Sequence, residues 1–156
     1  MSFFRRTVKF DLLAWSLPLL YLVHLLEEYY AGERFPVWFS RVLHAALSEA
    51  DFILINTIGI AVFFGAVLVY SISRKNKIIV VGLGCVLFIN GFVHLFSSII
   101  SGSYSPGTIS GLFLYIPMGF LLLFRTMPPL TSKQRLTGLL LGGFIHIIVA
   151  AVALNI

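Results

Sequence analysis

The sequence predicts an all-α integral membrane protein: a bundle of five transmembrane helices plus a short interfacial amphipathic helix. Hydrophobic residues make up 59% of the 156 residues and charged residues only 11%, whereas a soluble domain is about half apolar and about a quarter charged. Apolar runs long enough to cross a bilayer recur along the chain. No polar stretch is long enough for a second domain, so residues 1–156 are expected to form a single domain.

Short charged or turn-forming segments separate the apolar runs. Pro18 lies inside the first run, removes one backbone donor and is expected to bend that helix. A basic turn at residues 74–77 separates the second run from the third, and Pro106-Gly107 precedes the fourth. The expected spans cover about residues 10–30, 52–73, 78–100, 109–124 and 136–155.

Residues 36–48 are expected to form the short amphipathic helix at the membrane surface. Pro36 suits the first position of a helix. Trp38 and Phe39 are residue types that favour the membrane interface. The segment is too short and too polar to cross the bilayer, so we expect it to lie on the surface.

The basic residues are distributed unevenly between the two sets of loops. Only Arg34 and Arg41 fall in the loops expected on one side; the other side holds Arg5, Arg6, Lys9, Arg74, Lys75, Lys77, Arg125, Lys133 and Arg135. The positive-inside rule then predicts a multi-pass protein of the cell membrane with its N-terminus in the cytoplasm and its C-terminus outside. Orientation also explains the net charge of +5, so no nucleic-acid partner is expected.

The sequence His24-Leu-Leu-Glu27-Glu28 ends the first apolar run. Glu27 and Glu28 follow His24 at i+3 and i+4, so all three lie on neighbouring parts of one helical face. A charged residue near the centre of a span costs about 2.5–3.5 kcal/mol. Such residues persist where they face a partner or a cavity; alternatively, the two glutamates only end the span at the headgroups.

Polar residues of other spans fall at a similar depth. Asn56, Asn90, His94 and His146 all lie in the middle or outer part of their expected spans, whereas the inner half is almost without polar residues. This clustering predicts a shared site. The alternative is structural: the histidines would bond neighbouring backbone, and the asparagines would link helices through bonds that average about 0.6 kcal/mol.

Two kinds of chemistry fit these residues. His24, His94 and His146 with Glu28 would supply the ligands of a divalent metal, zinc or iron, with the other glutamate free as a general base. Without a metal, Glu27 and Glu28 would share protons in a medium of low dielectric constant and the histidines would relay them. Both alternatives remain open at the level of sequence.

Four motifs follow one another in a set order, and together they resemble the HXXEE domain family. They are His24-Leu-Leu-Glu27-Glu28, Phe35-Pro36-x-Trp38, Asn90-x-x-x-His94 and Tyr104-x-Pro106-Gly107, so the resemblance extends from the first span to the fourth. It implies a small multi-pass membrane protein with enzymatic activity, and it singles out His24, Glu27, Glu28, Asn90, His94, Pro106 and Gly107. His146 is a candidate only because of its expected depth in the membrane.

We therefore expect an integral-membrane enzyme that acts on a membrane lipid or another amphiphile in the outer half of the membrane. Glu27, Glu28 and Asn90 would be catalytic, and Asn56, Tyr104, Pro106 and Gly107 would contact the substrate. A proton- or metal-ion-coupled transporter is an alternative, although the five spans show no inverted halves. An accessory membrane subunit is a further alternative, and a homo-oligomer is compatible with all three.

Overall fold

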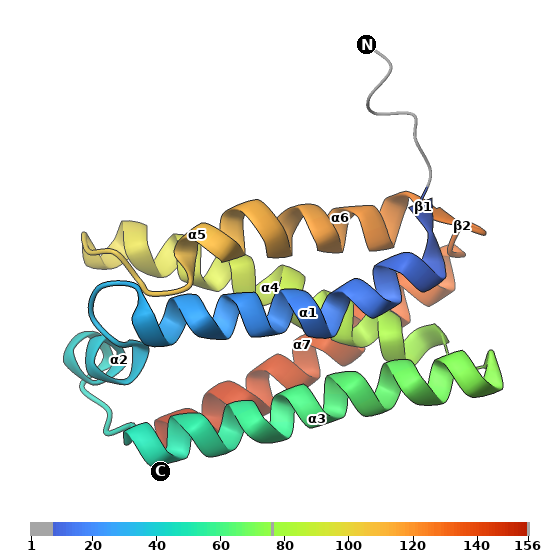
Figure 1. Ribbon diagram of the computed structural model, residues 1–156. Helices are drawn as coiled ribbons and strands as arrows, with labels where there is room; N and C mark the ends of the chain where they lie inside the picture. Colours follow the sequence, from blue (N-terminus) through green and yellow to red (C-terminus); the bar gives the residue numbers. More distant parts are fainter. Residues whose placement is uncertain (1–7, 76, 156) are drawn as a thin grey trace.

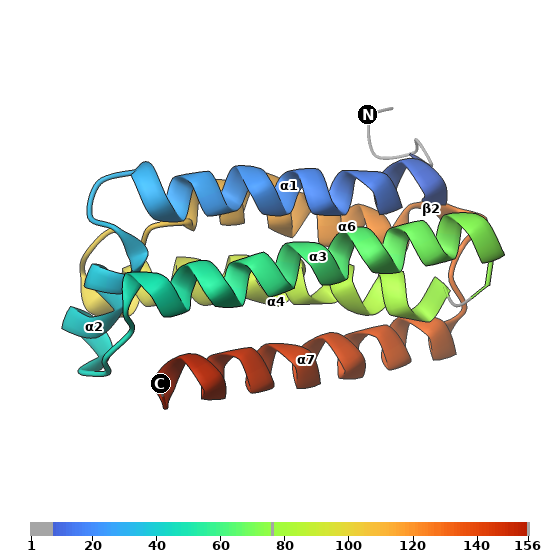
Figure 2. The same cartoon turned by 60° about the horizontal axis from the view of Figure 1, so that its bottom comes forward.

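The computed structural model describes residues 8–75 and 77–155, and these are almost entirely helical. The long helices are α1 (Phe10–Tyr30), α3 (Glu49–Ser73), α4 (Lys77–Ser101) and α7 (Ser132–Leu154). A further helical stretch consists of α5 (Thr108–Ser110), the π-helical turn η2 (Gly111–Tyr115) and α6 (Ile116–Phe124). These segments run along the length of the bundle, and α2 (Phe35–Leu43) lies at one end (Figures 1 and 2).

The expected all-helical architecture is confirmed. Within the described residues, α1, α3, α4 and α7 are each long and apolar enough to cross a membrane. Thr108–Phe124 is a shorter apolar helical stretch, so four of the five expected spans are candidates by length and composition. Arg5 and Arg6 of the expected basic N-terminal arm lie outside the described residues.

Two expected helix boundaries were wrong, and the helix ends observed in the structure explain the differences. The helix expected over 36–48 ends at Leu43, because His44 adopts a left-handed conformation with φ of 54°. Ser48 then caps α3 by accepting a hydrogen bond from the amide of Asp51 at 3.1 Å, so α3 begins at Glu49 and contains the span expected over 52–73. A capping box between Thr131 and Gln134 starts α7 at Ser132 rather than at residue 136.

Two glycines let α7 pack closely against α4. A Cβ atom added to Gly138 would lie 2.4 Å from Val81 Cγ1, and one added to Gly142 would lie 2.5 Å from Cys85 Cβ. Side chains larger than hydrogen would therefore push these helices apart. Two small residues four positions apart are a common basis for close contact between membrane helices.

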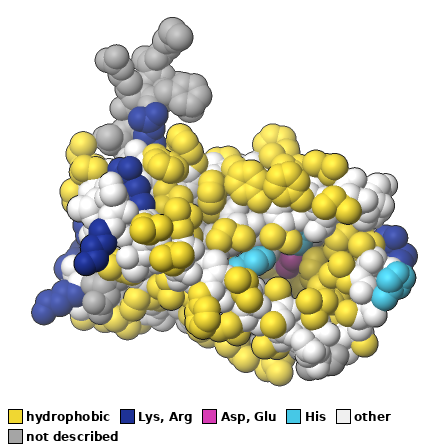
Figure 3. Space-filling model, turned by 180° about the vertical axis from the view of Figure 1, so that it is seen from behind, with side chains coloured by type: hydrophobic (Ala, Val, Ile, Leu, Met, Phe, Trp, Pro, Cys, Tyr) yellow, Lys and Arg dark blue, Asp and Glu magenta, His cyan; other side chains and the backbone are white. Residues whose placement is uncertain are grey.

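The opposite end of the bundle from α2 is tied by a short parallel pairing that the sequence did not predict. The strands β1 (Val8–Lys9) and β2 (Thr126–Met127) pair Val8 with Thr126 and Lys9 with Met127. The start of α1 is thereby held beside the segment that follows α6. Most of the lysine and arginine side chains visible from behind lie at this end (Figure 3).

Candidate metal centre

His24, Glu28 and His94 meet inside the bundle. His24 and Glu28 are one turn apart on α1, and His94 comes from α4. The three residues are only 4%, 6% and 3% exposed. His24 Nε2 lies 3.4 Å from Glu28 Oε1, and His94 Nε2 lies 3.2 Å from the same oxygen. One potential ligand atom from each side chain lies within 4.8 Å of the other two.

A serine hydroxyl contacts the outer nitrogen of each imidazole. His24 Nδ1 lies 2.7 Å from Ser110 Oγ, and His94 Nδ1 lies 3.1 Å from Ser105 Oγ. The Ser110 hydroxyl also donates to the carbonyl oxygen of Gly107 at 3.4 Å. It can therefore accept a hydrogen bond from His24 Nδ1–H, in the tautomer whose Nε2 lone pair points toward Glu28. Metal-binding histidines are commonly held by such an outer hydrogen bond.

The turn that carries both serines fits closely over the two histidines because it contains Gly107. This residue has φ of +100°, a conformation that L side chains rarely adopt. An added Cβ atom would lie 2.7 Å from His24 Cε1 and 2.9 Å from His94 Cε1. The neighbouring Pro106 is fully buried. Gly107 thus forms part of the wall of the site, with Pro106 buried beside it, and their expected contact with a substrate stays a prediction.

Glu27 faces this same turn, not the histidines. Its Oε1 accepts from the amide of Ile109 at 2.8 Å, and its Oε2 accepts from the amide of Ser110 at 2.6 Å. The Tyr104 hydroxyl donates a further hydrogen bond to this carboxylate. Burial, together with the nearby Glu27, raises the pKa of Tyr104, so that its hydroxyl remains a donor. Glu27 therefore satisfies free amides at the helix start, as a capping carboxylate does.

The other residues expected at the site, Asn56, Asn90 and His146, are not part of the group formed by His24, Glu28 and His94 among the described residues. Asn56 links helices: its Oδ1 accepts from the Tyr21 hydroxyl at 2.7 Å, and its Nδ2 donates to the carbonyl of Phe52 at 2.9 Å. Asn90 lies one turn before His94 on α4, and its buried Oδ1 has no hydrogen-bond partner among the described residues. His146 is half-buried on α7 and is outside the ligand group found in the described part of the chain.

Sequence reasoning missed three residues of the site. Ser105 and Ser110 are two of them, and a signal for both existed, because they flank the Pro106-Gly107 pair. The third is Tyr115, whose ring stacks on that of His24 with centroids 4.3 Å apart. Tyr115 lies in an apolar run and carries no sequence signal of its own. Phe35 closes another side, with its ring 5.5 Å from that of His94.

The geometry fits a divalent metal. Ligand bonds of about 2.0–2.1 Å in tetrahedral arrangement place ligand atoms about 3.3 Å apart, close to the 3.2 and 3.4 Å separations from Glu28 Oε1. Charge-assisted hydrogen bonds are shorter, about 2.7–2.9 Å. Among the described residues, His24 Nε2 has no partner in hydrogen-bonding geometry. Two histidines and one carboxylate are a ligand set of catalytic zinc and non-haem iron sites.

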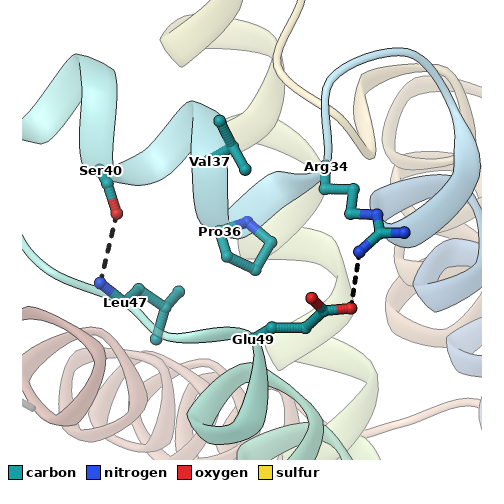
Figure 4. A pocket seen from close by; sticks show the side chains of 6 residues that line it. All are labelled: Arg34, Pro36, Val37, Ser40, Leu47 and Glu49. Atoms are coloured by element: carbon teal, nitrogen blue, oxygen red, sulfur yellow. Dashed lines mark hydrogen bonds and ion pairs between the residues drawn. The ribbon is translucent and has the colours of Figure 1, made fainter.

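Two hollows lie toward the α2 end. The surface seen from behind has a hollow, ringed by hydrophobic side chains, in which histidine and acidic surfaces are visible (Figure 3). A separate pocket of about 340 Å³ is lined by Arg34, Pro36, Val37, Ser40, Leu47 and Glu49 (Figure 4). Arg34 and Glu49 form an ion pair of 2.7 Å across it. Phe35, whose ring packs near His94, lies in the sequence between Arg34 and Pro36, which both line this pocket.

A comparison with known protein families identifies the family of this chain. The family model described as a protein of unknown function with HXXEE motif matches residues 15–122. The chain belongs to this family. The match contains the whole ligand group and the turn at residues 105–110. Among curated proteins and solved structures, nothing matches the chain. In this HXXEE protein, the histidine and the second glutamate of the motif face His94, and the first glutamate caps a helix.

Proposed function

We propose that this HXXEE protein is an integral-membrane enzyme that acts on a lipid or another amphiphile with the help of a divalent metal, zinc or iron. The buried group of His24, Glu28 and His94 carries the proposal. Its outer nitrogens are held by serine hydroxyls, and its inner atoms have the spacing of metal ligands.

The environment of Glu27 favours a metal over proton sharing between two carboxylates. Both oxygens of Glu27 already accept backbone amide hydrogens. Glu28 instead faces two imidazoles. The two carboxylates thus have separate partners, and a shared proton between them has no support in the geometry. A cation between Glu28 and the histidines would balance the buried charge.

The proposed arrangement in the membrane keeps five spans and a cytoplasmic N-terminus. Thr108–Phe124 has the length of a short span, about 25 Å for 17 helical residues, and it packs along α4. The basic residues at the β1 and β2 end would lie in the cytoplasm by the positive-inside rule. The proposed metal group, which consists of His24, Glu28 and His94, would then lie in the outer half of the membrane. The hollow of Figure 3 would open toward lipid.

The chain's own residues would divide the tasks of binding and catalysis. A divalent ion bound by the three side chains would act as a Lewis acid toward an oxygen of the substrate. Asn90, with its buried unpartnered Oδ1, would orient a hydroxyl or amide group of the substrate. The apolar surface of the helices would hold the acyl chains. Hydrolysis and isomerisation both suit this arrangement.

Elemental analysis of the purified protein tests the metal. Detergent-purified protein should contain about one zinc or iron per chain, and His24→Ala, Glu28→Gln and His94→Ala should each lose it. His44→Asn is the matched control, because His44 is exposed and outside the group. His146→Ala should also retain the metal. Protein that binds neither metal, or ligand variants that keep the metal, would contradict the proposal.

Turnover is tested separately. Wild-type protein and Glu28→Gln would be reconstituted in vesicles of a total lipid extract, and the lipids would be compared by mass spectrometry over time. We expect species that change with the wild-type protein and stay constant with Glu28→Gln. Equal lipid profiles for the two proteins, with metal present only in the wild type, would argue for a transporter or an accessory subunit instead.

A further inference from the structure

Tyr115 is a buried polar side chain beside the group of His24, Glu28 and His94. It is 1% exposed and belongs to the π-helical turn η2. Its ring stacks on the imidazole of His24, with centroids 4.3 Å apart and planes 30° apart. Its hydroxyl is buried and has no hydrogen-bond partner among the described residues.

Packing alone does not explain a tyrosine at this position. A buried hydroxyl without a partner lowers the stability of the fold, and buried tyrosine hydroxyls usually find a partner. Phenylalanine would fill nearly the same space without this cost, and the chain uses 15 phenylalanines elsewhere. Tyr21 shows the usual case in the same bundle, because its hydroxyl donates to Asn56 Oδ1 at 2.7 Å.

The local backbone is arranged to hold Tyr115 against the site. A Cβ atom added to Gly91 of α4 would lie 2.8 Å from the carbonyl oxygen of Gly111 and 3.2 Å from Tyr115 Cβ. Glycine at position 91 thus lets α4 and η2 come into contact. The π-helical turn also follows Ser110, so that Ser110 and Tyr115 both contact the imidazole of His24. Single π-helical turns occur frequently at functional sites.

We propose that the Tyr115 hydroxyl is a substrate-binding group that donates a hydrogen bond to a carbonyl or carboxylate oxygen in the head group of the amphiphile. The inference rests on the proposed function and narrows its substrate class to amphiphiles with an acceptor oxygen, such as acyl esters or fatty acids. A neutral phenol is a donor to such oxygens. The stacked ring places it beside His24, within reach of a head group held at the metal group.

The test compares two tyrosine-to-phenylalanine variants in nanodiscs. Tyr115→Phe should weaken binding of dodecanohydroxamate, an acyl chain with a metal-binding head group, about tenfold, the effect of one hydrogen bond. Its metal content should be unchanged, and its melting temperature equal or higher, because an unpartnered hydroxyl has been removed. Tyr21→Phe should do the reverse: its melting temperature should fall while hydroxamate affinity stays at the wild-type value.

A second probe separates this inference from the metal proposal. Binding of dodecanoate to protein kept in chelator should also weaken about tenfold in Tyr115→Phe. If the protein holds no metal but this difference persists, the metal proposal fails and the assignment of Tyr115 stands. Wild-type affinity of Tyr115→Phe for both probes, or failure of the wild-type protein to bind either probe, would overturn the assignment. So would a fall in melting temperature like that of Tyr21→Phe.

Discussion

Glu27 and Glu28 are neighbours in sequence, but their side chains leave the helix about 100° apart. Glu27 reaches the amides of Ile109 and Ser110, whereas Glu28 lies between the imidazoles of His24 and His94. Small changes at single residues around them should therefore have separable effects. Two predictions at this scale concern the turn over the histidines.

Replacing Gly107 by alanine should disrupt the metal group as well as the fold. The new methyl group would lie 2.7 Å from His24 Cε1 and 2.9 Å from His94 Cε1, in a backbone conformation with φ of +100°. Gly102→Ala is the matched control, because Gly102 also has positive φ, +61°, but has open space around it. Both variants should lose about 1 kcal/mol or more of unfolding free energy from backbone strain. Only Gly107→Ala should lose metal in elemental analysis; equal metal content in the two would contradict the close fit.

Removing the serine hydroxyls should weaken metal binding without removing a ligand. Ser105→Ala and Ser110→Ala each remove the hydroxyl that contacts the outer nitrogen of one histidine. We expect each variant to bind the metal about 10- to 100-fold more weakly, the usual effect of losing such an outer hydrogen bond. Competition with a chromophoric chelator would measure the metal affinity of each variant. Ser16→Ala is the control, since the Ser16 hydroxyl donates to the carbonyl of Leu12 on its own helix. Unchanged affinity in both site variants would show that the serines do not orient the imidazoles.

At the scale of elements, the helix that starts at Thr108 is anchored by a residue of another helix. Its first free amides are satisfied by Glu27 of α1, and Tyr104 of the preceding loop joins the same carboxylate. This contact fixes the position of the turn that carries Ser105, Gly107 and Ser110. The π-helical turn that follows then brings Tyr115 against His24.

Glu27→Gln and Glu28→Gln should therefore separate stability from metal binding. Glu27→Gln loses one amide acceptor and the charge at a helix start, and should lower the unfolding free energy by about 1–2 kcal/mol while metal is retained. Glu28→Gln should lose the metal. Unfolding in denaturant and elemental analysis would measure the two effects. Glu33→Gln is the control: Glu33 pairs with Arg41 near the surface, so both quantities should stay close to wild type. Loss of metal in Glu27→Gln alone would reverse the assignment of the two glutamates.

At the scale of the whole molecule, the two ends of the bundle differ in charge. More lysine and arginine side chains are visible at the end with β1 and β2, the basic end, than at the end with α2 (Figures 1 and 3). Arg74 at the basic end is paired with Asp11 at 2.6 Å, and Lys77 lies 5.2 Å from the ring centre of Phe10. His24, Glu28 and His94 lie away from this end, on the last turns of α1 and α4. The orientation of the bundle therefore decides which leaflet the site would face.

Cysteine labelling should give the orientation. Lys75→Cys at the basic end should be shielded from an impermeant thiol reagent in intact cells, and Ala46→Cys in the loop after α2 should react. Both positions are exposed, and the native Cys85 is buried and can be left in place. Permeabilised cells, in which both variants should react, are the control. The opposite pattern would invert the protein and place the metal group in the inner half of the membrane.

Local sequence was sufficient for the helices and for part of the site. Apolar runs, proline, glycine and helix caps act within a few residues, so the all-helical fold and the approximate course of each helix could be predicted. The missed boundaries at Leu43 and Ser132 also had local signals, in the caps around them. His24, Glu28 and His94 could be grouped because membrane depth follows from position along a span.

Only the tertiary structure decided how the helices are rotated about their axes and what each side chain meets. Depth alone placed His146 with the ligands, and helical spacing placed Glu27 with Glu28 as an acid–base pair. In the structure, rotation and packing bring the 105–110 turn to Glu27 and leave His146 outside the group found among the described residues. The contacts of Ser105, Ser110 and Tyr115 depend on a loop conformation and a π-helical turn that pack against helices distant in sequence. Such contacts have no local period in the sequence, because the free energy that selects them comes from residues on other helices.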